Sequence, residues 1–301
     1  MRFNHREDII QITPLWKGER MEDGRPKVPK SVLERLRKVT LEEAWGTLWR
    51  HGYKYQFEGD FKVINPDMVL VGRAVTGVMV PYRPDLNDTL LNYGHQEEGR
   101  SGYFNQWIID SLVEDDVVVV DMFDKIYQGT FVGGNLTTAI AARTKRGGSV
   151  IWGGVRDTEQ MMAIKNVKTY YRGNDPTGIG DVTLVSFNGP CRIGKAICLP
   201  GDVVLGTHAG VLFIPSHLAE ECATNAEKSN IRDVWGFQML DQGKYTTAQI
   251  DAGWTLDMWE DFLGWFETAP EAKDYQHLTW EKELEHAREI QGKEPKADIR
   301  L

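Results

Sequence analysis

The clearest periodic pattern in the chain lies between residues 133 and 157. Apolar residues at helical spacing are followed by basic residues, which favour the last turn of a helix, and the glycine pair 147–148 would end that helix. Residues 149–152 then form a short β-prone run. The pattern predicts a helix followed by a strand, and the outer ends of this unit are expected to return to one place.

Other elements can be predicted from the same kind of pattern. Helices are expected from Ser31 and from Thr40, and Thr40 followed three residues later by Glu43 has the form of a capping box. Residues 117–120 are apolar throughout, which is typical of a strand covered on both faces. The remaining β-prone runs predict strands at residues 68–80, 167–171, 182–187, 203–205 and 211–214.

Three further segments lack this regularity. Residues 1–30 contain several prolines and are interpreted as an arm that packs on a neighbouring subunit or on the core. Residues 81–103 are predicted to form a long loop, either a lid over a site or a subunit contact. The chain is therefore divided into the arm, a core domain at residues 31–250, and a helical, aromatic-rich extension at residues 251–301.

The extension carries apolar and aromatic residues at helical spacing, which indicates a packing surface for docking, including docking between subunits. These residues are Leu256, Trp259, Leu263 and Phe266. The last twenty residues, 282–301, are highly charged and are predicted to fray into solvent.

Composition narrows the class of protein. Hydrophobic residues make up 41% and charged residues 26%, as in ordinary globular proteins, and the net charge of −9 without a basic stripe argues against nucleic-acid binding. The three cysteines fit neither a disulfide framework nor a zinc motif, so buried free thiols are expected. No apolar run approaches the ~18 residues that span a bilayer. We therefore expect a cytoplasmic protein that does not contact membranes.

Candidate chemistry gathers at the two ends of the 133–157 unit. Gly133 and Gly134 would leave backbone N–H groups uncovered at a helix start, which suits a carboxylate or phosphate. Arg156 offers a planar fork of donors, and Asp157 offers a hard oxygen ligand for a divalent cation. There are simpler interpretations: Asn135 is a good helix N-cap, and Arg156 with Asp157 could be a solvated surface pair.

Five blocks in order resemble one known family, that of the regulator of ribonuclease activity A and the class II 4-hydroxy-4-methyl-2-oxoglutarate aldolases. The blocks are Gly72-x-Ala74-x-Thr76, Gly134-Asn135-Leu136, Gly153-Gly154-Val155-Arg156-Asp157, Arg172-Gly173 before Pro176, and Pro200-Gly201-Asp202-Val203-Val204. The resemblance implies an α/β sandwich of the swivelling β/β/α type, assembled into homotrimers or hexamers. It also implies a magnesium or manganese ion and a 2-oxo acid substrate.

The resemblance further implies roles for individual residues. Asp157 looks like the metal ligand, Arg156 like the residue that holds the substrate carboxylate and keto oxygen, and the backbone of Gly134, Asn135, Leu136 and Thr137 like the seat of the carboxylate. The family's aldolase signature is an Asp, twenty intervening residues, then Arg-Asp. Here the spacing is kept, but the first residue is Asn135.

This departure matters because a carboxamide orients water but does not accept a proton at neutral pH. His208 stands where the family tends to have an acidic residue, and it is either a replacement acid/base or a structural residue. Asp124 and Lys125 are weaker candidates of the same kind. Two functions follow as hypotheses. One is a metal-dependent lyase acting on a hydroxylated 2-oxo acid or a sugar acid, and the other is a non-catalytic regulator that binds a protein such as a ribonuclease.

Overall fold

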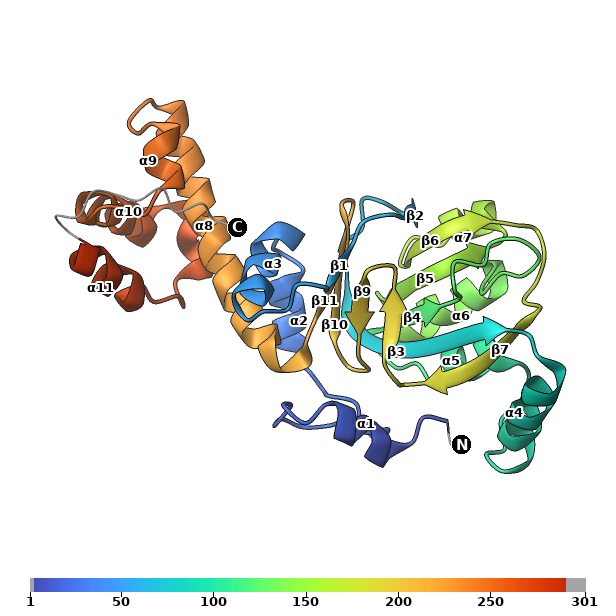
Figure 1. Cartoon of the computed structure of the whole chain (residues 1–301). Helices are drawn as coiled ribbons and strands as arrows, with labels where there is room; N and C mark the ends of the chain where they lie inside the picture. Colours follow the sequence, from blue (N-terminus) through green and yellow to red (C-terminus); the bar gives the residue numbers. More distant parts are fainter. Residues whose placement is uncertain (1–2, 291–301) are drawn as a thin grey trace.

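A computed structural model of the chain describes residues 3–290, and within them one mixed sheet of nine strands forms the core (Figure 1). Four neighbouring strands are parallel: β3 (Leu70–Pro81), β4 (Asp116–Asp121), β5 (Gly148–Val155) and β6 (Lys168–Asn174). The antiparallel strands are β1 (Phe57–Glu58), β2 (Lys62–Ile64), β7 (Val182–Phe187), β10 (Val203–Thr207) and β11 (Gly210–Ile214). The mixed α/β architecture agrees with the expected fold class.

Strand β4 shows why the sheet is buried on both sides. All six of its residues are buried, and alternate side chains enter two different hydrophobic clusters. Val118 and Val120 face helices, whereas Val117 and Val119 face the small hairpin of β8 (Cys191–Ile193) and β9 (Ala196–Cys198). The prediction of a strand covered on both faces is confirmed.

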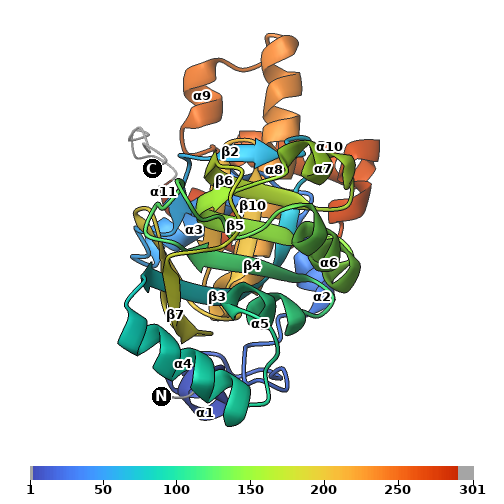
Figure 2. The same ribbon diagram turned by 90° about the vertical axis from the view of Figure 1, so that its right-hand side faces the viewer.

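Helices cover one face of the sheet in two groups (Figure 2). Helices α5 (Phe104–Asp110), α6 (Gly134–Thr144) and α7 (Thr158–Ala163) pack over β4 to β6. Helices α2 (Lys30–Leu36) and α3 (Leu41–Arg50) pack over β10 and β11 with η1 (Ser216–Leu218) and the start of α8 (Ala219–Asp241). Thr40 and Glu43 form both bonds of the predicted capping box before α3.

The prediction of a loop at residues 81–103 is wrong over most of its length, because Pro84–Gln96 is helix α4. Pro84 occupies the first turn, where its missing N–H costs nothing. Leu86, Leu90 and Tyr93 give the helix an apolar stripe that packs against the core beside β7. The many polar residues on its outer face hid this stripe from the sequence pattern.

The N-terminal arm packs on the core of its own chain. Its short helix α1 (Arg6–Ile12) buries Ile9, and Val28 is also buried. The Arg25 guanidinium donates to both carboxylate oxygens of Asp116 at 3.1 and 3.0 Å. Both side chains of this pair are fully buried, so the arm is fixed to the first residue of β4.

The C-terminal helices form a lobe of their own, at the left of Figure 1. The second half of α8 packs with α9 (Thr247–Asp251), α10 (Leu256–Thr268), η2 (Pro270–Tyr275) and α11 (Glu281–Ile290). Its buried rings include a chain whose successive centroids lie within 6 Å of one another: Trp235, Trp254, Trp259, Phe262 and Trp280.

Two expectations about this region need correction. The aromatic stripe of α10 packs inside the chain, because its Trp259 and Phe266 are buried against the other helices of the lobe. The charged segment predicted to fray is helix α11 up to Ile290, and residues 291–301 lie outside the described residues.

Two further findings bear on the sequence predictions. The three cysteines are buried free thiols, as expected. Among residues 3–290 no helix has both the length and the apolar character needed to cross a membrane.

Candidate functional site

The predicted unit of helix and strand is present, and its outer ends do meet. Helix α6 ends at Thr144, β5 begins at Gly148, and the chain turns after Val155 into α7. Asp157 makes this turn in the left-handed region, with φ of 54° and ψ of 40°. The Arg156 N–H donates to the Val132 carbonyl at 3.0 Å, which ties the end of β5 to the segment that enters α6.

Glycine at position 133 permits this close approach. A Cβ added there would lie 2.3 Å from Asp157 Oδ2 and 2.8 Å from Arg156 Cγ, well inside van der Waals contact. The Gly134 N–H donates to Asp157 Oδ2 at 3.3 Å, and Arg156 Nε lies 3.8 Å from the same oxygen. The start of α6, the guanidinium and the carboxylate therefore form one group.

Two details of this group differ from expectation. The N-cap of α6 is Gly133 in an extended conformation, so Asn135 is the second residue of the helix, and its side chain is exposed. The Gly134 N–H is directed to Asp157, so the helix start is not uncovered at that residue. Asn135 is consequently available to face a ligand, because no capping bond holds it.

Arg156 lies between two hollows. The first, called here the α6 hollow, has a volume of 310 Å³ and opens at the start of α6. It is lined by Tyr103, Asn105, Gln106, Thr130, Phe131, Val132, Gly133, Asn135, Leu136, Arg156 and Ile179. The second, the α7 hollow, has a volume of 320 Å³ and is lined by Arg156, Asp157, Thr158, Glu159, Gln160, Asn174, Asp175 and Pro176. Arg156 is common to both.

The two hollows differ in charge. Of the described residues that line them, Arg156 is the only cation, and the α6 hollow has no acidic residue. The α7 hollow has three carboxylates, those of Asp157, Glu159 and Asp175. Hydrogen bonds from the hydroxyl and the backbone N–H of Thr177 hold the pKa of Asp175 below its ordinary value, so that carboxylate is ionised at neutral pH.

Part of the lining of the α6 hollow lies outside the 133–157 unit and comes from residues that the sequence pattern did not single out. Tyr103 is fixed by a bond from its hydroxyl to the Val182 carbonyl at 2.9 Å, and burial raises the pKa of its phenol. The Asn105 amide donates to the Phe131 carbonyl at 2.8 Å. Ile179 comes from the Gly/Pro/Asp-rich loop after β6, and that composition was the available signal.

Of the remaining predicted site residues, only Leu136 reaches one of the two hollows. Leu136 lines the α6 hollow, whereas Thr137 is fully buried in the first turn of α6, and in the described structure its hydroxyl has no hydrogen-bond partner. His208 lies in the turn between β10 and β11, beside the start of β3 and so at the opposite end of the parallel strands from Arg156. Within one chain, the fold therefore does not bring His208 to this group.

The side chains of Asp124 and Lys125, the weaker candidates that follow β4, are engaged in hydrogen bonds away from this group. Asp124 accepts a hydrogen bond from Arg172 Nε at 2.9 Å. Lys125 Nζ donates to the carbonyls of Tyr127 and Gln128 at 2.6 and 2.9 Å. Neither side chain lines the two hollows.

The chemistry around Asp157 is compatible with a magnesium or manganese ion. Over residues 3–290 no three His, Cys, Asp or Glu side chains are arranged as a ready-made metal cage. Magnesium, however, is commonly held by one or two carboxylates while water and substrate oxygens complete its shell. Asp157 is one-third exposed at the mouth of a 320 Å³ hollow, which leaves room for such a shell.

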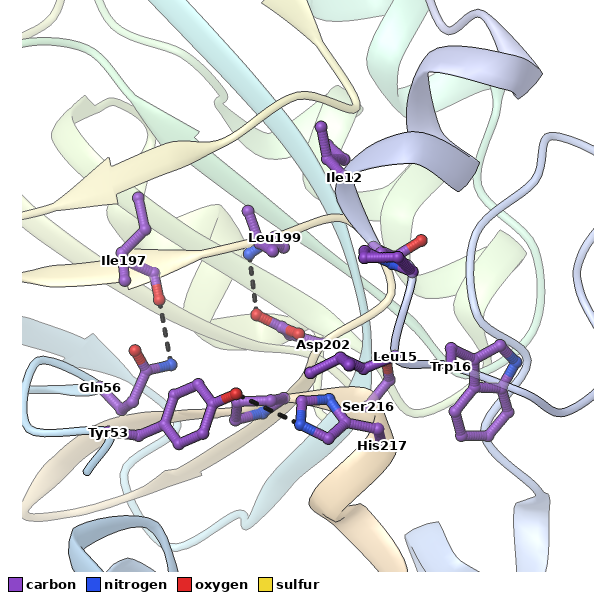
Figure 3. A pocket seen from close by; sticks show the side chains of 13 residues that line it. Ile12, Leu15, Trp16, Tyr53, Gln56, Ile197, Leu199, Asp202, Ser216 and His217 are labelled. Carbon is purple, nitrogen blue, oxygen red and sulfur yellow. Dashed lines mark hydrogen bonds between the residues drawn. The ribbon is translucent and has the colours of Figure 1, made fainter. Parts of the chain in front are cut away.

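A third hollow, of 250 Å³, lies between the N-terminal arm and the core (Figure 3). Its polar groups bond to one another or to the backbone: Gln56 donates to the carbonyls of Ile197 and Phe213, Asp202 accepts from the Leu199 N–H, and Tyr53 meets His217 at 3.2 Å. Burial raises the pKa of Asp202 to about 7. With its polar groups paired and its lining mostly apolar, this hollow is a weaker candidate for chemistry on an acid.

Known proteins agree with the fold. An uncharacterised protein from Pseudomonas syringae pv. tomato is 20% identical, with a TM-score of 0.61, and the match covers 74% of this chain and 93% of that one. RraAS2 from Streptomyces coelicolor, described as an unusual member of the RNase ES inhibitor RraA family, is 19% identical with a TM-score of 0.59, covering 70% and 97%.

A protein described among novel cellulases from microbes associated with the gut ecosystem is 21% identical, with a TM-score of 0.58, and the match covers 75% of this chain and 94% of that one. No curated protein matches the chain. The model of the RraA-like family, described as Aldolase/RraA, matches residues 40–213, which is more than half of the sequence. The chain therefore belongs to the RraA-like family.

Proposed function

We propose that this protein is a divalent-metal-dependent lyase that acts on a hydroxylated 2-oxo acid or a sugar-acid derivative. The observation that carries the proposal is the position of Arg156 and Asp157, which meet the start of α6 at the junction of two hollows. The family includes aldolases, in keeping with this proposal.

Each part of the group has a role in the proposal. The half-exposed guanidinium of Arg156 binds the carboxylate and the keto oxygen of the substrate, aided by the positive end of α6. Asp157 would hold magnesium or manganese, which would supply positive charge beside the keto oxygen of the substrate. Asn135, exposed on the first turn of α6, orients the substrate or a water molecule through its amide.

In the aldol cleavage of a 4-hydroxy-2-oxo acid, the C3–C4 bond breaks and its electron pair remains on C3 as an enolate. The C4 hydroxyl loses its proton to water and becomes a carbonyl, and C3 then takes a proton from water. Arg156 stabilises the charge that develops on the keto oxygen, and the loss of such a preorganised donor commonly costs about 2.7–4 kcal/mol. Loss of water from a sugar acid would pass through an enediolate-like species on the carboxylate: C2 gives up its proton to water, and the C3 hydroxyl takes up a proton and leaves as water.

Decarboxylation of oxaloacetate is the simplest probe of this group. The C3–C4 bond breaks, carbon dioxide leaves, and the electron pair stays on C3 until it takes a proton from water. No side-chain base is required, so Asn135 is no obstacle to this reaction. The reaction reports enolate stabilisation without identifying the physiological substrate.

The test separates binding of the metal from binding of the substrate. Manganese affinity, measured by calorimetry, is expected to fall at least tenfold in Asp157→Asn and to remain in Arg156→Lys. Cleavage of a panel of 4-hydroxy-2-oxo acids is expected to fall in both variants. Matched controls lie at the other end of α6, where Arg143 and Asp110 form an exposed pair at 2.9 Å. Wild-type activity in Arg156→Lys and Asp157→Asn would refute the proposal.

A non-catalytic regulator that binds a protein such as a ribonuclease is the second candidate. Asn135 favours it, because an amide replaces the carboxylate of the aldolase signature. Absence of manganese binding together with absence of turnover would support this candidate. We also propose a homo-oligomer, a trimer or hexamer, and light scattering after size-exclusion chromatography measures the mass that decides this point.

A further inference from the structure

We propose that the substrate of this site has a single carboxylate and an uncharged, hydroxylated tail, and that the site discriminates against acids with a second, distal carboxylate. This inference rests on the proposed function, because it concerns the same group around Arg156. It goes further by assigning one hollow to each end of the substrate.

The distribution of charge sets the orientation. The carboxylate of the substrate requires Arg156, which both hollows share. On the α6 side it meets neutral residues and the positive end of a helix of eleven residues. On the α7 side it would meet the carboxylates of Glu159 and Asp175. The carboxylate therefore binds in the α6 hollow, and the rest of the molecule passes Arg156 into the α7 hollow.

The lining of the α7 hollow suits hydroxyl groups. Glu159 and Asp175 accept hydrogen bonds, while the amides of Gln160 and Asn174 both donate and accept. Asp175 is held in place because its Oδ1 accepts from the N–H of Thr177 at 3.0 Å and also from the Thr177 hydroxyl. A polyhydroxylated chain offers a donor and an acceptor at every carbon, which this lining matches.

In the proposed function the metal at Asp157 is engaged by the reacting end of the substrate, so a distal carboxylate finds no cationic side chain of its own in the part of the α7 hollow that the structure describes. Among the described residues that line the hollows, the one cation is already used by the first carboxylate. A second carboxylate in the α7 hollow would stand among three acidic side chains, one of which, Asp157, is shared with the metal in the proposed function. Repulsion between the second carboxylate and these acidic side chains disfavours binding.

Gluconate and glucarate test the inference directly, because these six-carbon acids differ only at C6, which is a hydroxymethyl group in one and a carboxylate in the other. Dissociation constants are measured by calorimetry with the magnesium-loaded protein. Gluconate is expected to bind at least about tenfold more tightly than glucarate. Glu159→Gln, alone and with Asp175→Asn, is expected to reduce that ratio, whereas the control Glu260→Gln on the exposed face of α10 leaves it unchanged.

Equal or tighter binding of glucarate, no binding of either acid, or an unchanged ratio in both carboxylate variants would overturn the inference. The single variant keeps the test valid if Asp175→Asn disturbs its loop. Failure of the proposed function is recognised separately, because metal-dependent decarboxylation of oxaloacetate would then be absent. In oxaloacetate the second carboxylate is itself the leaving group and does not reach the tail position.

Discussion

Replacing Gly133 by alanine tests whether Arg156 and Asp157 act together. The backbone at position 133 is extended, with φ of −136° and ψ of −161°, so alanine adopts it without strain. The new Cβ, however, would lie 2.3 Å from Asp157 Oδ2 and 2.8 Å from Arg156 Cγ. Since ordinary contact begins near 3.4 Å, both side chains have to move by roughly 0.6–1.1 Å.

A displacement of this size is large for catalysis and small for folding. Misplacing a reacting group by about 1 Å can cost about 100-fold in rate, which corresponds to ~2.7 kcal/mol. We expect kcat/KM for oxaloacetate decarboxylation to fall about 100-fold in Gly133→Ala, with a melting temperature within a few degrees of wild type. The displaced atoms belong to half-exposed side chains, so the fold itself absorbs the change.

Two other glycine variants complete the series. In Gly134→Ala the Cβ would meet chiefly the end of the Gln160 side chain, with Oε1 at 2.1 Å, so the expected loss is several-fold smaller than in Gly133→Ala. In Gly264→Ala, on α10, the Cβ meets nothing within 4 Å, and wild-type activity is expected. A folded Gly133→Ala protein with wild-type kcat/KM would refute the reasoning that links the geometry of this group to turnover.

Two predictions concern stability. Arg25→Met removes the guanidinium that donates to both oxygens of the buried Asp116 carboxylate and leaves Arg73 Nε, at 3.6 Å, and the Val113 N–H as its partners. The free energy of unfolding is expected to fall by up to about 3–5 kcal/mol in urea titrations, against less than about 1 kcal/mol for Lys27→Met in an exposed pair. Similar losses in the two variants would contradict this assignment. Burial raises the pKa of Asp202 to about 7, so between about pH 4 and pH 7 the folded protein keeps a proton that the unfolded chain has released. The free energy of unfolding is therefore expected to fall as pH rises through that window, by an amount on the order of a few kcal/mol, and an identical pH profile in Asp202→Asn would show that this carboxyl is not responsible.

The centre of the site was predictable because its parts are close in sequence. Helical spacing, the glycine pair and the β-prone run define α6 and β5, and one helix followed by one strand brings Gly133 back to Arg156 and Asp157. The resemblance to the family rests on the same short blocks. In this unit the residues that form the site are close in sequence, so the sequence pattern was enough to predict their arrangement.

The surroundings of the site could not be predicted in the same way. Tyr103 and Ile179 reach the α6 hollow from segments on either side of the central unit, and no periodicity marks such long-range contacts. Polar residues between the apolar positions of α4 made its apolar stripe hard to recognise in the sequence. The aromatic rings of the C-terminal lobe pack against α8 of the same chain, a contact that the sequence pattern does not show. The residue type of Asn135 favours an N-cap, one of its two interpretations from sequence, but the extended Gly133 occupies that position.

The central claim is that Arg156 and Asp157 form a metal-dependent site for enolate chemistry. The most direct measurement is the rate of oxaloacetate decarboxylation, with and without magnesium, for wild type, Asp157→Asn and the control Asp110→Asn. Asparagine tolerates the left-handed backbone of residue 157, so the variant is expected to fold. The account predicts magnesium-dependent turnover in wild type and control and at least a 100-fold loss in Asp157→Asn. Turnover that is absent in wild type, or that persists in Asp157→Asn, would contradict it.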